Sequence, residues 1–193
     1  MNRNCLLCGV GGQGTVLASK LLAYAAMKKG AEVRTSETIG MAQRGGCVVS
    51  HVRMGKDIAS PMVPKHSAQV IIGFEPGEAV RCLEYLAEDG VVIVNRKGVM
   101  PITANFGAKK YDAEEMIGYL KENAKKLIIV DGENICEKCG SGKVLNIALL
   151  AAAVSTGELG ISLEELKEAI KERLPERFHE MNLKAVDLAV EKI

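Results

Sequence analysis

Near the amino terminus, an apolar run at residues 5–8 is followed at once by the hexapeptide GVGGQG, residues 9–14. A helical pattern begins near Gln13, so strand, glycine turn and helix follow in the order of a phosphate-binding βα unit. In such a unit Gly9 permits a tight turn, Gly11 a close backbone approach to an anion, and Gly14 close packing of helix on strand. A glycine-rich turn can also serve only to reverse the chain, so this motif alone leaves anion binding open.

A second glycine-rich segment lies in the polar loop of residues 38–46, where Arg44 is followed by two glycines. Backbone amides beside a guanidinium form a suitable nest for an oxyanion or phosphate, although a solvated surface loop is the alternative. The predicted binding residues, all in the two glycine-rich segments, are Gly9, Gly11, Gly12, Gln13, Gly14, Gln43, Arg44, Gly45 and Gly46. A dinucleotide site would also place an acid near the end of the second strand, but Thr35 and Ser36 stand there, with Glu37 just beyond.

The rest of the chain alternates between strand and helix patterns. Strands are predicted at residues 31–36, 47–54, 69–74, 91–94 and 127–130. Helices are predicted at residues 13–29, 78–87, 112–123, 143–154, 162–174 and in a final segment to about residue 192. The first helix is expected to bury Leu17, Leu21, Leu22 and Ala25. This order predicts a single domain over residues 1–193, an α/β fold in which a three-layer α/β/α sandwich surrounds a mainly parallel, Rossmann-like sheet.

The composition argues against a nucleic-acid-binding protein and against a membrane-spanning one. The 193 residues carry a net charge of +1, which argues against a dedicated nucleic-acid-binding protein with its basic surface. Only 4% of residues are aromatic and Trp is absent, so base-stacking platforms are not available in number. The longest apolar run, residues 144–154, covers about half a membrane span and contains Asn146. With no signal peptide visible, we expect a cytoplasmic protein that binds neither membrane nor nucleic acid.

Two cysteine pairs have metal-like spacing. Cys5 and Cys8 lie three apart on a predicted strand and would point to opposite faces, so buried core positions are expected. Cys136 and Cys139 fall in a short helical or turn segment, where an ordinary helical turn is favoured over a zinc or redox site. No metal site is predicted, and no run of closely spaced cysteines suggests an iron–sulfur cluster. His51, a single histidine in a strand, is expected to be structural.

Five segments taken together resemble a known family. They are GVGGQG at 9–14, GMAQRGG at 40–46, VSHVR at 49–53, GFEPGEAVR at 73–81 and VIVN at 92–95. They are similar to the gamma-type domain of the 2-oxoacid:ferredoxin oxidoreductases, and the wording of the second and fourth favours the indolepyruvate (beta-subunit) branch over the pyruvate branch. The resemblance runs from about Asn4 to the carboxyl terminus and includes Asn146 and Asn182.

The resemblance implies a small subunit of a complex that oxidatively decarboxylates arylpyruvates to aryl-acetyl-CoA and passes electrons to ferredoxin. Thiamine diphosphate and iron–sulfur clusters are then expected in the large alpha subunit, with CoA as co-substrate and no cofactor bound by this chain alone. The two glycine-rich loops are expected to face the partner's cofactor or the entering CoA, with Arg44 neutralising a phosphate or carboxylate. No catalytic residue is assigned. The isolated chain is expected to be inactive and to form homodimers through its partner-facing surface.

Two alternatives remain open at this point. One is a stand-alone NAD(P)-dependent oxidoreductase, which the missing ribose-binding acid disfavours. The other is a non-catalytic scaffold for the large subunit. The Cys136 and Cys139 pair departs from the family pattern, which leaves a lineage-specific metal or redox role for it open as well.

Overall fold

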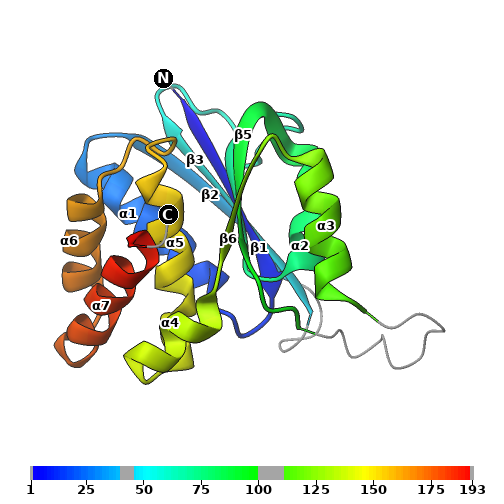
Figure 1. Cartoon of the computed structure of the whole chain (residues 1–193). Coiled ribbons are helices and arrows are strands. Elements are labelled where there is room, and N and C mark those ends of the chain that lie inside the picture. The colour runs from blue at the N-terminus through cyan, green and yellow to red at the C-terminus, as the bar shows by residue number, and fades with distance from the viewer. Residues whose placement is uncertain (1, 40–45, 100–110, 192–193) are drawn as a thin grey trace.

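The computed structural model describes residues 2–39, 46–99 and 111–191 of the chain, and a twisted six-stranded sheet forms its centre (Figure 1). In spatial order the strands are β2 (Glu32–Ile39), β3 (Cys47–Gly55), β1 (Arg3–Val10), β4 (Ala68–Gly73), β5 (Leu86–Asn95) and β6 (Lys126–Val130). The β1–β4, β4–β5 and β5–β6 pairs are parallel, whereas β3 is antiparallel to both β1 and β2. The prediction of a mainly parallel sheet is therefore confirmed.

The position of β3 determines which strand lies beside the end of β1, where the glycine turn begins. Strands β2 and β3 pair as an antiparallel hairpin, which places β3 rather than β2 beside β1. A connection as short as residues 40–46 can join only antiparallel neighbours, because a parallel pair needs a longer crossover. As a result β3 begins where β1 ends, with Cys47 opposite Val10.

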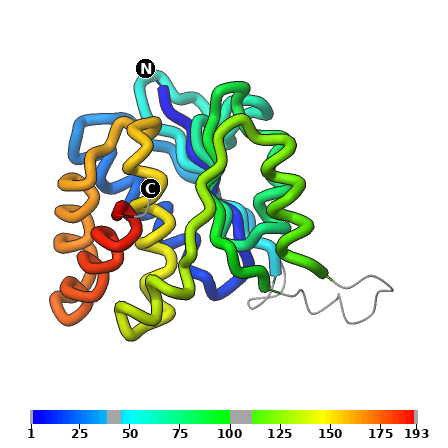
Figure 2. The backbone as a smooth tube through the Cα atoms, viewed as in Figure 1, coloured from blue at the N-terminus to red at the C-terminus, as the bar shows by residue number. Residues whose placement is uncertain are grey.

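Helices cover both faces of the sheet, which confirms the three-layer α/β/α arrangement (Figures 1 and 2). On one face lie α1 (Thr15–Lys28), α4 (Gly132–Cys139), α5 (Leu145–Ser155), α6 (Leu163–Arg173) and α7 (His179–Val190). On the other face lie α2 (Pro76–Arg81) and α3 (Ala113–Asn123). Within the described ranges, short 3-10 turns also lie at Leu83–Tyr85, Gly142–Val144 and Glu176–Phe178.

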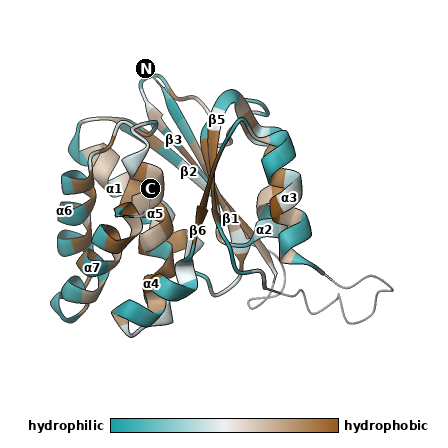
Figure 3. Ribbon diagram, viewed as in Figure 1, coloured by the Kyte–Doolittle hydropathy of each residue, from teal (hydrophilic) through white to brown (hydrophobic). Residues whose placement is uncertain are grey.

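The larger core is built around α5. Its apolar residues from Ile147 to Val154 are all buried, because the helix packs on the sheet with one side and on α6 and α7 with the other. Figure 3 shows the matching pattern, in which hydrophobic colour concentrates on the strands and on the helix faces turned toward them. None of the helices in the described residues combines the length and apolar character needed to cross a lipid bilayer.

The helix boundaries follow the sequence, with one clear exception. Helix α1 ends as predicted before Gly30, which has a φ of 79°, and α6 begins with the predicted capping box of Ser162 and Glu165. The helix predicted at residues 78–87 is wrong at both ends: α2 is Pro76–Arg81, and Leu86 already belongs to β5. Glu75 and the proline after it start this helix earlier, since a carboxylate N-cap followed by proline is a strong start signal.

The inward face of α1 was predicted incorrectly at one position. Leu21 and Leu22 are buried as expected, but the side chain of Leu17 is 38% exposed. Ala18 takes the inward place on the first turn, so the buried stripe runs through positions 18, 21, 22, 25 and 26.

Candidate functional site

The glycine turn connects β1 to α1, but its first glycine is not part of the turn itself. Gly9 lies within β1, and a Cβ atom there would stand 2.7 Å from the Phe74 Cβ atom and 2.7 Å from the Gln13 Oε1 atom. The prediction that Gly9 provides a tight turn is therefore wrong. A small residue is needed at this position because the end of β4 and the Gln13 side chain approach the strand so closely.

Gly14 is the residue that starts the helix. It is the N-cap of α1 with a φ of 85°, in the left-handed region where residues other than glycine are strained. A Cβ atom at Gly14 would lie 2.7 Å from Nδ2 of Asn146 on α5, whose amide donates to the Gly14 carbonyl at 3.4 Å. The close packing expected at Gly14 thus exists, but its partner is α5 rather than the preceding strand.

A backbone hydrogen bond joins the two predicted binding loops. The Gly11 N–H donates to the Gly46 carbonyl at 2.8 Å. This bond brings one end of the second loop against the glycine turn, but it also occupies the amide that was expected to approach an anion. Gln43, Arg44 and Gly45 lie outside the described residues.

Gln13 acts as a structural clamp. Its Oε1 accepts from the Val10 N–H at 2.8 Å, and its Nε2 donates to the Phe74 carbonyl at 3.0 Å. Asn95, at the end of β5, donates to the same carbonyl at 3.4 Å. The ends of β1, β4 and β5 are thereby held together by two side-chain amides, and the Gln13 amide is already engaged by the backbone.

The electrostatics at the start of α1 suit an anion. The first turn of α1 contains no acidic residue. Ala18 is the first residue whose N–H bonds back to the turn, to the Gly14 carbonyl at 3.1 Å. Within the described part of the chain, no acceptor meets the N–H groups of Thr15 and Val16. Free amides at the positive end of a helix dipole form a site for negative charge.

Two buried acids beside this edge, Glu75 and Glu78, were not identified from the sequence. Glu75 is 3% exposed, caps α2 by accepting from the Glu78 N–H at 2.9 Å, and also accepts from the Tyr111 hydroxyl. Glu78, 4% exposed, accepts from Arg81 at 2.8 Å. Loss of hydration and the neighbouring Glu78 carboxylate raise the pKa of the Cys47 thiol to about 12, so this thiol stays protonated at neutral pH.

Cys5, Cys8 and His51 take structural positions. Cys5 and Cys8 are buried in the two separate cores on opposite faces of β1, as predicted. Cys136 and Cys139 lie on α4, and within the described residues no group of three or more Cys, His, Asp or Glu side chains is arranged to hold a metal ion. The His51 Nδ1 accepts from the Val63 N–H at 3.1 Å, and burial lowers the pKa of its imidazole.

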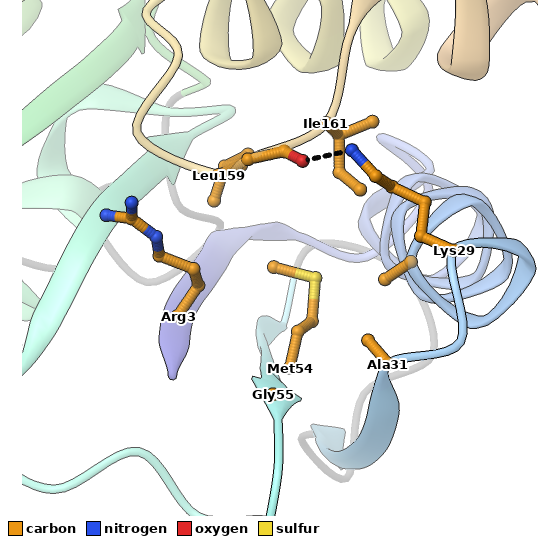
Figure 4. A pocket seen from close by; sticks show the side chains of 9 residues that line it. Arg3, Lys29, Ala31, Met54, Gly55, Leu159 and Ile161 are labelled. Atoms are coloured by element: carbon orange, nitrogen blue, oxygen red, sulfur yellow. Dashed lines mark hydrogen bonds between the residues drawn. The ribbon is translucent and has the colours of Figure 1, made fainter. Parts of the chain in front are cut away.

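A pocket of about 310 Å³ lies at the opposite edge of the sheet, where β1 begins (Figure 4). Met54 and Leu159 form part of its apolar lining, and Arg3 and Lys29 stand at its sides. Lys29 donates to the Gly160 carbonyl at 2.8 Å and pairs with Glu165 at 3.1 Å, and Arg3 lies 3.9 Å from Glu158. Because both cations already face carboxylates, this pocket offers less to an anion than the start of α1 does.

The sequence and the fold match a defined class of proteins. The chain belongs to the family described as pyruvate ferredoxin/flavodoxin oxidoreductase, whose pattern matches residues 4–192. This confirms the resemblance found in the sequence.

Individual relatives give more detail. The chain is 37% identical over 189 residues to the indolepyruvate oxidoreductase subunit IorB of Archaeoglobus fulgidus, a match that covers 97% of this chain and 94% of that protein. It is 30% identical to the pyruvate/ketoisovalerate oxidoreductases common subunit gamma of Pyrococcus furiosus, over 95% and 93% of the two chains. The keto/oxoacid ferredoxin oxidoreductase gamma subunit of Geobacter sulfurreducens has the same fold, with a TM-score of 0.72, 23% identity and coverage of 98% and 97%.

Proposed function

We propose that this chain is the small subunit of an indolepyruvate:ferredoxin oxidoreductase, which converts an arylpyruvate and CoA to aryl-acetyl-CoA and passes the electrons to ferredoxin. The observation that carries the proposal is the nearly full-length similarity to IorB subunits, at 37% identity, against 30% for the pyruvate/ketoisovalerate gamma subunit. Thiamine diphosphate and iron–sulfur clusters belong, on this proposal, to a large partner subunit.

The glycine-turn edge is the part of this chain that would face the reacting molecules. The Gly11–Gly46 bond holds the last residue of the second loop against the glycine turn, and the free amides at the start of α1 follow this turn in the chain. This surface would bind a phosphate of CoA or the carboxylate of the oxoacid, with Arg44 supplying a guanidinium. Gly12, which is exposed and has a φ of 102°, leaves room for the ligand, since no atom lies within 4 Å of the position that a Cβ would take.

Reconstitution tests the proposal directly. The chain and its large subunit, purified separately and then mixed, are expected to reduce ferredoxin or viologen only when indolepyruvate and CoA are both present. The large subunit alone should show less than about a tenth of this rate if the small subunit helps to form the active site. Full activity of the large subunit alone would leave a scaffold role. Tight NAD(P) binding by the chain with no effect on the complex would support a stand-alone oxidoreductase.

Arg44→Ala is expected to raise the KM of the assembled enzyme for CoA or for the oxoacid by about tenfold, because a charge-assisted hydrogen bond is lost. Arg34→Ala is the matched control, since Arg34 lies on β2 and pairs with Glu32 at 3.0 Å. Steady-state kinetics with each substrate varied in turn measure the effect. Kinetics of Arg44→Ala that equal those of the control would contradict the role given to this residue.

A further inference from the structure

Strand β6 forms one edge of the sheet and is apolar along most of its length. In the part of the chain that the structure describes, β5 is its only neighbour in the sheet. Figure 1 shows β6 running between α3 and α4, and Figure 3 shows it in the hydrophobic colour. Leu127, Ile128 and Ile129 are each only partly buried. An exposed apolar edge of this kind is a template for pairing with another strand.

The backbone groups that point out of this edge can be assigned. Successive residues of a strand direct their N–H and C=O groups to alternate sides. The Val130 carbonyl accepts from the Arg96 N–H at 2.9 Å, so Val130 is directed toward β5, and so is Ile128, two residues earlier. The N–H and C=O groups of Leu127 and Ile129 are therefore directed away from β5. Within the described residues no strand lies on that side to pair with them.

These outward groups suit a second strand of the same sequence. In an antiparallel pair, the residues that exchange hydrogen bonds lie directly opposite each other, and each such pair exchanges two bonds. A two-fold axis through Ile128 meets this condition, because it sets Leu127 of each copy opposite Ile129 of the other. A contact of this kind uses the same surface on both copies, so it closes as a dimer and does not continue into a fibre.

The side chains favour this register over its neighbours. Leu127 and Ile129 both pack against the core on the α2 and α3 face, so the paired side chains would meet on one face of the sheet. Lys125, just before the strand, would come opposite Asp131, just after it, which sets opposite charges together at both ends. An axis through Leu127 would instead place Lys125 against Ile129. An axis through Ile129 would place Leu127 against Asp131.

We propose that two copies of this chain associate through β6, in an antiparallel pair centred on Ile128 that continues the sheet from one copy to the other. A second copy fits this edge because residues 125–131 complement themselves in both apolar surface and charge. The contact goes beyond the function proposed above. Since β4 and β5 separate β6 from β1, pairing at β6 leaves the glycine turn free, and association can be tested without the large subunit.

Sedimentation equilibrium of the full-length chain measures the association. A reversible monomer–dimer equilibrium is expected, with a dissociation constant below about 100 µM. Ile129→Lys places a charge at the centre of the edge and should weaken the dimer by roughly tenfold or more. Met27→Lys is the matched control, since Met27 is 52% exposed on α1, and it should leave the dissociation constant within about twofold. Circular dichroism checks that both variants are folded. A monomer at every concentration, or equal dissociation constants for the two variants, would overturn the proposal.

Cross-linking tests the register itself. Ile128 would lie opposite its own copy in a non-hydrogen-bonded pair, where the Cβ atoms come close enough for a disulfide. Oxidised glutathione should therefore convert Ile128→Cys to a covalent dimer in several-fold higher yield than Leu127→Cys, because residue 127 of the second copy would lie only diagonally across. The unaltered chain gives the background from the native cysteines. Equal yields for the two variants, or a yield for Ile128→Cys no higher than the background, would overturn the proposed pairing.

Discussion

Replacing Gly14 with alanine is expected to lower the free energy of unfolding by about 2–4 kcal/mol, because two costs add. The left-handed backbone, with a φ of 85°, strains any residue that has a Cβ atom. The new methyl group would also lie 2.7 Å from the Asn146 Nδ2 atom and displace the amide that bonds to the Gly14 carbonyl. Urea denaturation of the isolated chain, monitored by circular dichroism, measures the change.

Gly12→Ala separates the two costs. Gly12 also has a left-handed φ, of 102°, but nothing lies within 4 Å of its Cβ position. This variant should therefore lose only the backbone contribution, about 1–2 kcal/mol. If both variants lost the same stability, a clash with Asn146 would make no measurable contribution to the effect of Gly14→Ala.

Replacing Leu22 with alanine is expected to cost about 2–5 kcal/mol in unfolding free energy. Its side chain is fully buried in the core formed by α1, α5, α6 and the sheet, so truncation leaves a cavity. Leu17→Ala on the same helix should cost less than about 1 kcal/mol, because Leu17 is 38% exposed. Thermal unfolding of both variants with matched buffers provides the comparison. A larger loss of stability for Leu17→Ala than for Leu22→Ala would contradict the placement of Leu17 outside the core.

Local patterns predict the layers of this fold but not the order of its strands. The alternation of apolar strands and amphipathic helices was sufficient for the three-layer sandwich, and the capping box at Ser162 located the start of α6. The insertion of β3 beside β1 depends on pairing between residues far apart, such as Leu6 with His51, which no local pattern contains. Leu17 was misplaced because Ala18, less hydrophobic but better positioned, takes the buried place on the first turn.

The candidate site was predicted less completely than the fold. The sequence identified the glycine turn, but the bond between Gly11 and Gly46 and the clamp formed by Gln13 arise only when separate segments meet. Gly9 was given a role in the turn because spacing motifs assume a standard strand end, whereas β1 continues to Val10. The start signal of Glu75 and Pro76 was present in the sequence and would have revealed the cap of α2.

The central place of β1 has a consequence for how the chain is made. β1 is synthesised before the other strands of this sheet, yet its neighbours β3 and β4 come from residues 47–55 and 68–73. Until those residues leave the ribosome, the apolar side chains of Leu6 and Leu7 have neither flanking strand to pair with. β1 is therefore paired on both sides only after β3 and β4 have been synthesised. Premature termination before β4 would yield a polypeptide in which one edge of β1 stays open and apolar, and such an edge favours aggregation.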